Sequence, residues 1–142
     1  MNWTPERDGA SILPHGGYAR FVDRVLEYGP GELSCIGRIP DESPFAREGR
    51  APGFVLLELA AQVAAIEVLA KTAGARPRVG YLARARGLNW TAEGVPTGAA
   101  LEASVRREES LPPLYTFSAT VTLAGVEVFD GTFSIYVDEK AY

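Results

Sequence analysis

The sequence is poor in cysteine and in basic residues. Its single cysteine, Cys35, excludes an internal disulfide framework and leaves no cysteine cluster for a structural zinc site. The 14 Lys and Arg residues are outnumbered by 18 Asp and Glu, which gives a formal net charge of −4. Because nucleic-acid binding needs a basic surface, this balance argues against such a role.

No cleaved secretory signal is expected from the first residues of the sequence. The first residues, MNWTPERDGA, lack the basic region and apolar run of a secretory signal, so we expect a cytoplasmic protein. The long apolar run at residues 53–70 contains Glu58, Gln62 and Glu67. A lone membrane span would place each carboxylate in hydrocarbon at about 3 kcal/mol, so the run is predicted to be a buried helix that is covered on almost every side.

The order of elements predicts an α+β domain. A length of 142 residues, 46% of them hydrophobic, suits one domain over residues 1–142. Two strands are expected before a Pro-rich and charged loop at residues 40–52, and a helix then runs from Gly53 to about residue 73, with Gly74 as its stop. The predicted strands cover residues 19–28, 32–39, 79–90, 99–108, 114–123 and 126–137. We therefore expect a curved antiparallel sheet wrapped around one long apolar helix.

Two motifs of the sequence have a characteristic spacing. The first is Leu13-Pro14-His15, six residues, then Val22-Asp23-Arg24-Val25. The second is Pro52-Gly53, four apolar residues, Glu58, three residues and Gln62. The first resembles the start, and the second the central-helix motif, of the β-hydroxyacyl-(acyl-carrier-protein) dehydratases of fatty-acid synthesis. The resemblance covers roughly residues 12–138 and looks closest to the divergent dehydratase-like proteins of aryl-polyene lipid synthesis. It implies the hotdog fold, usually a homodimer with paired sheets.

The same resemblance implies an activity. Dehydratases of this family convert 3-hydroxyacyl thioesters on an acyl carrier protein to trans-2-enoyl thioesters, in fatty-acid, polyene or related lipid synthesis. The substrate would be carried on the phosphopantetheine of the carrier or on coenzyme A, with no other cofactor and no metal. This chemistry needs a base for the proton beside the carbonyl, an acid for the departing hydroxyl, and donors for the enolate-like oxygen.

Glu58, Gln62 and Gly53 are the candidates on the predicted helix. We expect Glu58 to be desolvated, which favours a neutral carboxyl that can act as acid or acid/base, but a structural glutamate bonded to Gln62 or to a dimer partner fits as well. Gln62 either orients that carboxyl or is a neutral core amide. Gly53 is a candidate oxyanion donor because a helix start has unpaired N–H groups, and its alternative is a plain turn glycine.

The segment that carries the family's catalytic histidine differs in this chain. The family has a Gly-His-Phe-Pro segment before the helix, whereas residues 43–52 read SPFAREGRAP, which is shorter and has no histidine. The only imidazole belongs to His15, within Pro-His-Gly-Gly. His15 is therefore either a relocated catalytic group or a structural histidine bonded to a backbone carbonyl.

Arginine pairs and aromatic residues are further candidates. Arg84 and Arg86, two residues apart on a predicted strand, should project to one side and could contact an acidic carrier protein, with Arg76 and Arg78 just upstream; a solvated strand face is the alternative. Four aromatic residues are either tunnel lining or core, namely Trp3, Phe45, Tyr81 and Trp90.

Two further assignments are structural. Cys35 is expected to be a small core residue, and Asp23 and Arg24 are expected to stabilise their strand.

Two other functions remain open on the same fold. In a thioesterase, the helical carboxylate would activate water and release a free acid. A non-catalytic acyl-carrier or lipid-binding protein would keep the tunnel without the chemistry. Product analysis separates dehydration from hydrolysis, since fold alone decides neither.

Overall fold

The computed structural model describes residues 20–69 and 79–138 of the chain. A six-stranded antiparallel sheet has the order β1-β2-β6-β7-β8-β4. Its strands are β1 (Val22–Gly29), β2 (Glu32–Gly37), β4 (Val79–Trp90), β6 (Leu101–Leu111), β7 (Leu114–Leu123) and β8 (Val126–Asp138). A second sheet pairs β3 (Arg50–Ala51) with β5 (Val95–Pro96), and the 3-10 turn η3 (Gly53–Val55) leads into helix α2 (Leu56–Leu69).

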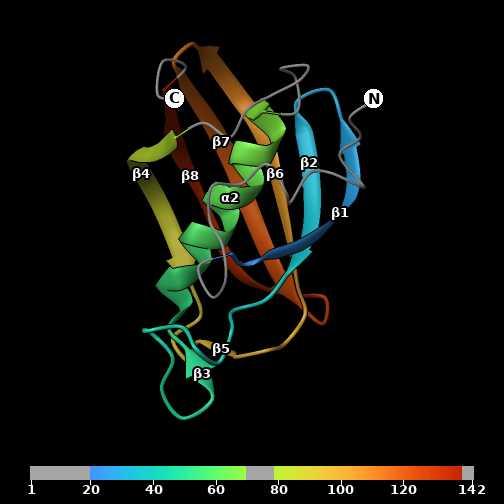
Figure 1. Cartoon of the computed structure of the whole chain (residues 1–142), viewed down its shortest axis with the longest axis vertical. Coiled ribbons are helices and arrows are strands. Elements are labelled where there is room, and N and C mark those ends of the chain that lie inside the picture. The colour runs from blue at the N-terminus through green and yellow to red at the C-terminus, as the bar shows by residue number, and fades with distance from the viewer. Residues whose placement is uncertain (1–19, 70–78, 139–142) are drawn as a thin grey trace.

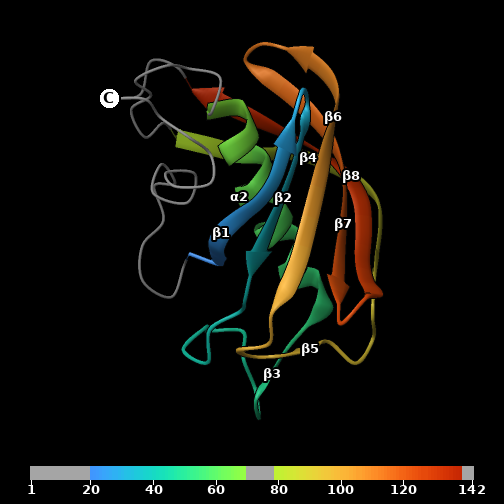
Figure 2. The ribbon, with the colours of Figure 1, turned by 90° about the vertical axis from the view of Figure 1, so that its right-hand side faces the viewer.

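The sheet wraps around the helix, as the hotdog resemblance implied. Helix α2 lies across one face of the sheet, with β4 and β1 at the two sheet edges (Figure 1). The view turned by 90° shows the curvature of the sheet around α2 (Figure 2). The small β3–β5 sheet lies at the end of the molecule where η3 begins. The expected α+β hotdog architecture is therefore confirmed.

Alternating side chains explain which face of the sheet meets the helix. Along β6, Leu101, Ala103 and Val105 are buried, whereas Glu102 and the other residues between them are exposed. A strand directs successive side chains to opposite faces, so the apolar set of each strand packs toward α2. Each large apolar side chain buried in this way contributes about 1.5–3 kcal/mol to folding.

Helix α2 is buried on most of its circumference but keeps one open face. Leu56, Leu59 and Val63 are fully buried. Glu58 is exposed, and Ala61 and Ala65, three and seven residues after it, are only partly buried. This spacing forms a single stripe along a helix. The expectation of cover on almost every side is thus met except along this stripe.

A buried ion pair joins the second half of α2 to β6. Nε of Arg107 donates to Oε2 of Glu67 over 2.9 Å, and the two side chains are only 16% and 3% exposed. The Arg107 guanidinium also lies over the ring of Tyr115, 5.4 Å from its centroid. Removal of one partner from such a buried pair is strongly destabilising, because the charge of the other partner stays buried.

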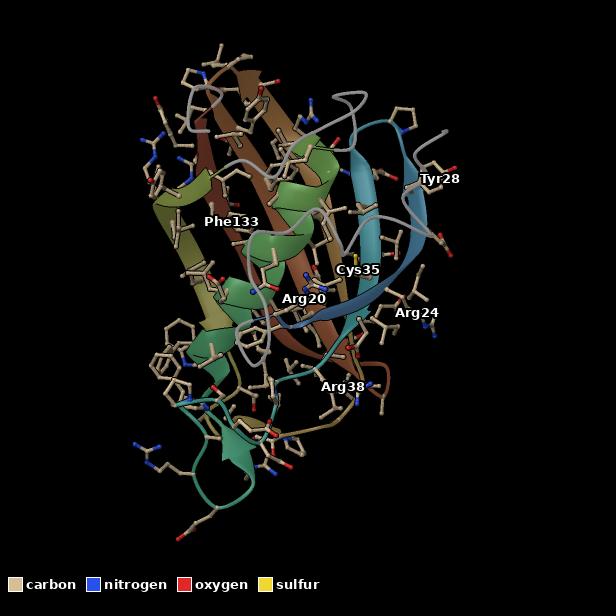
Figure 3. The ribbon with its side chains drawn as sticks, in the orientation of Figure 1. Arg20, Arg24, Tyr28, Cys35, Arg38 and Phe133 are labelled. Atoms are coloured by element: carbon tan, nitrogen blue, oxygen red, sulfur yellow. The ribbon has the colours of Figure 1, made fainter. Side chains whose placement is uncertain are left out.

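Two of the structural assignments made from sequence can be checked directly. Cys35 is fully buried between the sheet and α2, and its burial raises the pKa of the thiol to about 12, which confirms it as a core residue (Figure 3). Asp23 accepts a hydrogen bond from Nε of Arg38 over 2.8 Å and so joins β1 to the segment after β2. Arg24 is exposed on β1.

The predicted strands and the helix are present, but several of their bounds differ from the predictions. Strand β1 begins at Val22, although it was expected from residue 19, and β2 ends at Gly37 rather than at residue 39. The turn expected at residues 109–113 is shorter, because β6 continues to Leu111. Residues 50–51 and 95–96, expected in loops, pair as β3 and β5. The expected helix end at residue 73 and the stop at Gly74 lie outside the described residues. Within the described part of the chain, no helix has the length and apolar character that crossing a membrane needs.

Candidate active site

A buried amide links the candidate carboxylate to the backbone of a distant segment. Gln62 Nε2 donates to Oε1 of Glu58 over 3.1 Å, and Gln62 Oε1 accepts the N–H of Phe21 over 2.9 Å. Gln62 is 1% exposed. The expected contact between Glu58 and Gln62 is therefore present, and the amide that makes it is buried in the core.

The environment of Glu58 differs from the expectation. The sequence argument predicted a desolvated carboxyl inside an apolar helix, but the Glu58 side chain is exposed on the open stripe of α2. The prediction was wrong because a nearly continuous apolar run does not reveal which side of a helix its own sheet leaves uncovered. The Glu58 carboxyl is consequently accessible to a ligand that approaches from solvent.

Gly53 begins the helical segment directly after Pro52. Pro52 occupies the N-cap position with φ −61° and ψ 145°, and no side chain caps the helix start. The Val55 N–H is bonded to the Pro52 carbonyl over 3.1 Å, whereas within residues 20–69 and 79–138 the Gly53 N–H meets no acceptor. An unpaired N–H at a helix start is suited to hold a developing negative charge.

The structure adds a packing reason for glycine at position 53. A Cβ atom there would lie 2.7 Å from Cδ1 of Trp90 and 2.8 Å from the carbonyl oxygen of Thr91. Contacts this short do not occur between real side chains, so the end of β4 can approach the helix start only because residue 53 has no side chain. Gly53 is more than the plain turn glycine considered from the sequence.

Three of the four aromatic residues proposed for a tunnel or a core are described by the structure, and none of these three is in the core. Phe45, Tyr81 and Trp90 are exposed. Phe45 and Trp90 both contact Phe54, whose ring lies between them at the start of the helix. Phe54 was overlooked in the sequence because it reads as one more apolar residue of the helix, although its position four residues before Glu58 was a usable signal.

Arg84 and Arg86 lie on strand β4, as the sequence predicted. Arg84 pairs with Ser134 and Arg86 with Thr132 in the β4–β8 ladder, and both arginines are exposed. They therefore project to one side of the edge strand, as predicted. His15, Trp3, Arg76 and Arg78 lie outside the described residues, so their proposed roles stay predictions.

A cavity of about 410 Å³ lies between β1, β2, β6 and β7, away from these candidates. Glu27, Glu32, Ser34, Ser104 and Thr120 are among its lining residues, and neither Gly53 nor Glu58 borders it. Most of these side chains belong to the sheet face opposite the core. This cavity is therefore not the candidate active site.

Comparison with known proteins gives a consistent picture. Residues 8–142 match the family model described as ApeP-like, ApeP dehydratase. A protein of Halalkalibacterium halodurans described as an uncharacterized thioester dehydrase is 27% identical over 147 residues, covering 99% of this chain and 93% of that protein.

Two solved structures show the same fold at low identity. The dehydratase heterocomplex ApeI:P from Xenorhabdus doucetiae superposes with a TM-score of 0.81 at 18% identity, covering 98% of this chain and 94% of that chain. A hypothetical thioesterase with coenzyme A from Streptococcus pneumoniae has a TM-score of 0.61 at 15% identity, covering 84% of this chain and 88% of that chain.

Proposed function

The chain belongs to the ApeP-like dehydratase family, and from this membership we propose that it removes water from 3-hydroxyacyl thioesters to form trans-2-enoyl thioesters. The observation that carries the proposal is the exposed Glu58 carboxyl, which Gln62 holds five residues after Gly53. An acidic group and an uncapped N–H at one end of a helix are two of the three elements that this chemistry requires.

The steps can be assigned to groups of this chain. A base removes the proton from C2 while the C2=C3 double bond forms and the C3–O bond breaks, and the departing hydroxyl takes a proton to leave as water. We propose that His15, from the same or a partner chain, is the base that removes the C2 proton. The Glu58 carboxyl then donates the proton that the departing hydroxyl takes. The Gly53 N–H donates to the thioester carbonyl oxygen as negative charge develops on it.

Gln62 and Trp90 serve this arrangement indirectly. The hydrogen bond from Gln62 limits the rotation of the Glu58 carboxyl, because the amide is itself held by the Phe21 N–H. The Trp90 ring packs against Gly53 and helps to fix the direction of its N–H. Such positioning increases a rate because the reacting groups need no reorganisation during the step.

A second subunit would complete the site. Strand β4 is an edge of the sheet, and its exposed Tyr81 and Leu82 are large apolar residues. An open edge with apolar side chains is a template for strand pairing. We propose that two copies pair along β4 as a homodimer. A different hotdog chain is the second candidate, since the similar Xenorhabdus structure is described as a heterocomplex.

An acyl carrier protein is the proposed donor of the substrate, with coenzyme A as the alternative carrier. Arg84 and Arg86 form an exposed basic pair on one side of β4. Paired arginines suit the phosphate of phosphopantetheine and an acidic carrier surface. No further cofactor is proposed for the reaction.

Turnover by the Glu58→Gln protein tests the dehydratase assignment. We expect kcat for a carrier-linked 3-hydroxyacyl substrate to fall by about 10²-fold or more, because a positioned acid contributes that much to proton transfer. Mass spectrometry of the products distinguishes an enoyl thioester from a free acid and thiol. An unchanged rate in Glu58→Gln contradicts the role given to Glu58.

Hydrolysis is the second candidate function. It is favoured by one observation, namely that Glu58 is open to solvent and could activate a water molecule. Release of free acid from a saturated acyl thioester, without any enoyl product from the 3-hydroxy substrate, would establish it in place of dehydration.

A further inference from the structure

Three exposed aromatic side chains meet at the start of the helix. Phe45 comes from the loop between β2 and β3, Phe54 from η3 and Trp90 from the end of β4, and they are called the aromatic cluster below. The ring centroids of Phe45 and Phe54 are 5.8 Å apart and those of Phe54 and Trp90 are 6.5 Å apart, both edge to face. Their exposed fractions are 49%, 46% and 46%. A contiguous exposed apolar patch of this kind marks a site of contact.

The cluster is held in place by the surrounding backbone. The Phe45 N–H donates to Oγ of Ser43 over 3.3 Å, and Ser43 is buried. Trp90 is paired with Phe129 in the β4–β8 ladder and packs against Gly53. Edge-to-face contacts then fix the Phe54 ring between these two anchors. The apolar surface is therefore formed before any ligand arrives.

The cluster borders both proposed catalytic groups. Phe54 directly follows Gly53 and precedes Glu58 by four residues, and Phe54 and Glu58 are both exposed. Residues four apart project from one face of a helical segment. A thioester whose carbonyl oxygen meets the Gly53 N–H therefore has its acyl group within reach of these rings.

We propose that the aromatic cluster binds the apolar part of the acyl chain and makes the enzyme prefer long acyl groups to short ones. This proposal rests on the proposed reaction at Gly53 and Glu58. Each methylene group buried against the rings adds to binding, so a chain long enough to cross Phe54 gains affinity that a four-carbon chain does not.

The test compares two substrates in matched variants. We measure kcat/KM with 3-hydroxybutanoyl and 3-hydroxydecanoyl pantetheine thioesters for the wild type, Phe54→Ala, Phe45→Ala and Tyr28→Ala. Tyr28 is a suitable control because it is also exposed, on β1 at the sheet edge opposite β4 (Figure 3). We expect the preference for the ten-carbon substrate to fall about tenfold in Phe54→Ala, as for loss of contact with about two methylene groups. Tyr28→Ala should keep the wild-type preference.

Other outcomes overturn the proposal. An unchanged ratio in both phenylalanine variants, or an equal loss with both substrates, excludes a role in chain-length selection. Dissociation of the Phe54→Ala protein into smaller species in light scattering identifies the cluster as a subunit interface instead.

Failure of the reaction itself is separable from failure of this inference. If the wild type turns over neither substrate, binding of decanoyl pantetheine is measured by calorimetry in the same proteins. Weaker binding to Phe54→Ala than to the wild type supports acyl-chain binding by the aromatic cluster, although the dehydratase assignment fails. Equal binding to the two proteins overturns acyl-chain binding by the cluster as well.

Discussion

Gln62 donates from Nε2 to Oε1 of Glu58 over 3.1 Å, so a buried amide and an exposed carboxylate of one helix are coupled. The direction of the amide is determined by its other contact, because the Phe21 N–H can only donate and therefore faces Gln62 Oε1. The NH₂ group is left to face Glu58. The segment before β1 thus controls the orientation of the carboxyl 37 residues further along the chain (58 − 21 = 37).

Replacement of Gln62 tests this coupling. Gln62→Leu removes the donor to Glu58 and leaves the Phe21 N–H without its acceptor, so we expect a loss of about 1–3 kcal/mol in unfolding free energy and a fall of kcat. Val63→Ala, at a fully buried neighbour on α2, is the matched control, with a similar destabilisation and kcat retained. Urea unfolding and steady-state kinetics measure both quantities. If Gln62→Leu keeps the kcat of the control, Gln62 acts as a core amide alone.

Gly53→Ala is expected to disturb both packing and turnover. The new Cβ would lie 2.7 Å from Cδ1 of Trp90, so the end of β4 must shift, at about 1–3 kcal/mol. Gly29→Ala is the control, because no heavy atom lies within 4 Å of a Cβ built at Gly29. Thermal unfolding should distinguish the two variants. Wild-type stability and turnover in Gly53→Ala would be incompatible with the close approach of Trp90.

Arg107→Leu is expected to destabilise the fold by about 3–5 kcal/mol, because it removes the guanidinium that pairs with the buried Glu67 carboxylate. Arg106, the residue before Arg107 on β6, provides the control. Its contact with Glu32 has side chains that are 67% and 54% exposed, so Arg106→Leu should change the stability by less than about 1 kcal/mol. Equal effects in urea unfolding would show that the Glu67 pair contributes no more than a surface contact.

The burial of Cys35 predicts that the stability of the folded protein depends on pH. Its pKa is raised by burial from 9.0 to about 12 in the folded protein, so the thiol keeps its proton in the folded state when the unfolded chain loses it. The contribution of the Cys35 thiol to folding stability is therefore fully present below pH 9 and is lost as the pH rises from 9 toward 12. The stability of the wild type should fall relative to Cys35→Ala by about 1.4 kcal/mol per pH unit in that window.

Guanidinium titrations of the wild type and Cys35→Ala at pH 8 and pH 10 provide the measurement. A difference between the two proteins that does not change with pH would mean that the thiol ionises equally well in the folded state.

Part of the candidate site was predictable from the sequence. The spacing of four residues placed Glu58 beside Gln62, and the alternation in β4 placed Arg84 and Arg86 on one side. The exposure of Glu58 and the acceptor role of Gln62 toward Phe21 were not predictable. Both depend on which distant segment lies against each side of α2, and a local pattern does not contain that information.

Local patterns were enough to predict the six strands of the main sheet, the long helix and the core position of Cys35, since a period of two or of about 3.6 residues is a local property of the chain. The tertiary structure alone decided the pairing of β3 with β5, the partnership of Glu67 with Arg107, and the contact of Phe45, Phe54 and Trp90 at Gly53. Each of these joins segments that are far apart in the chain, and only the path of the folded backbone brings them together.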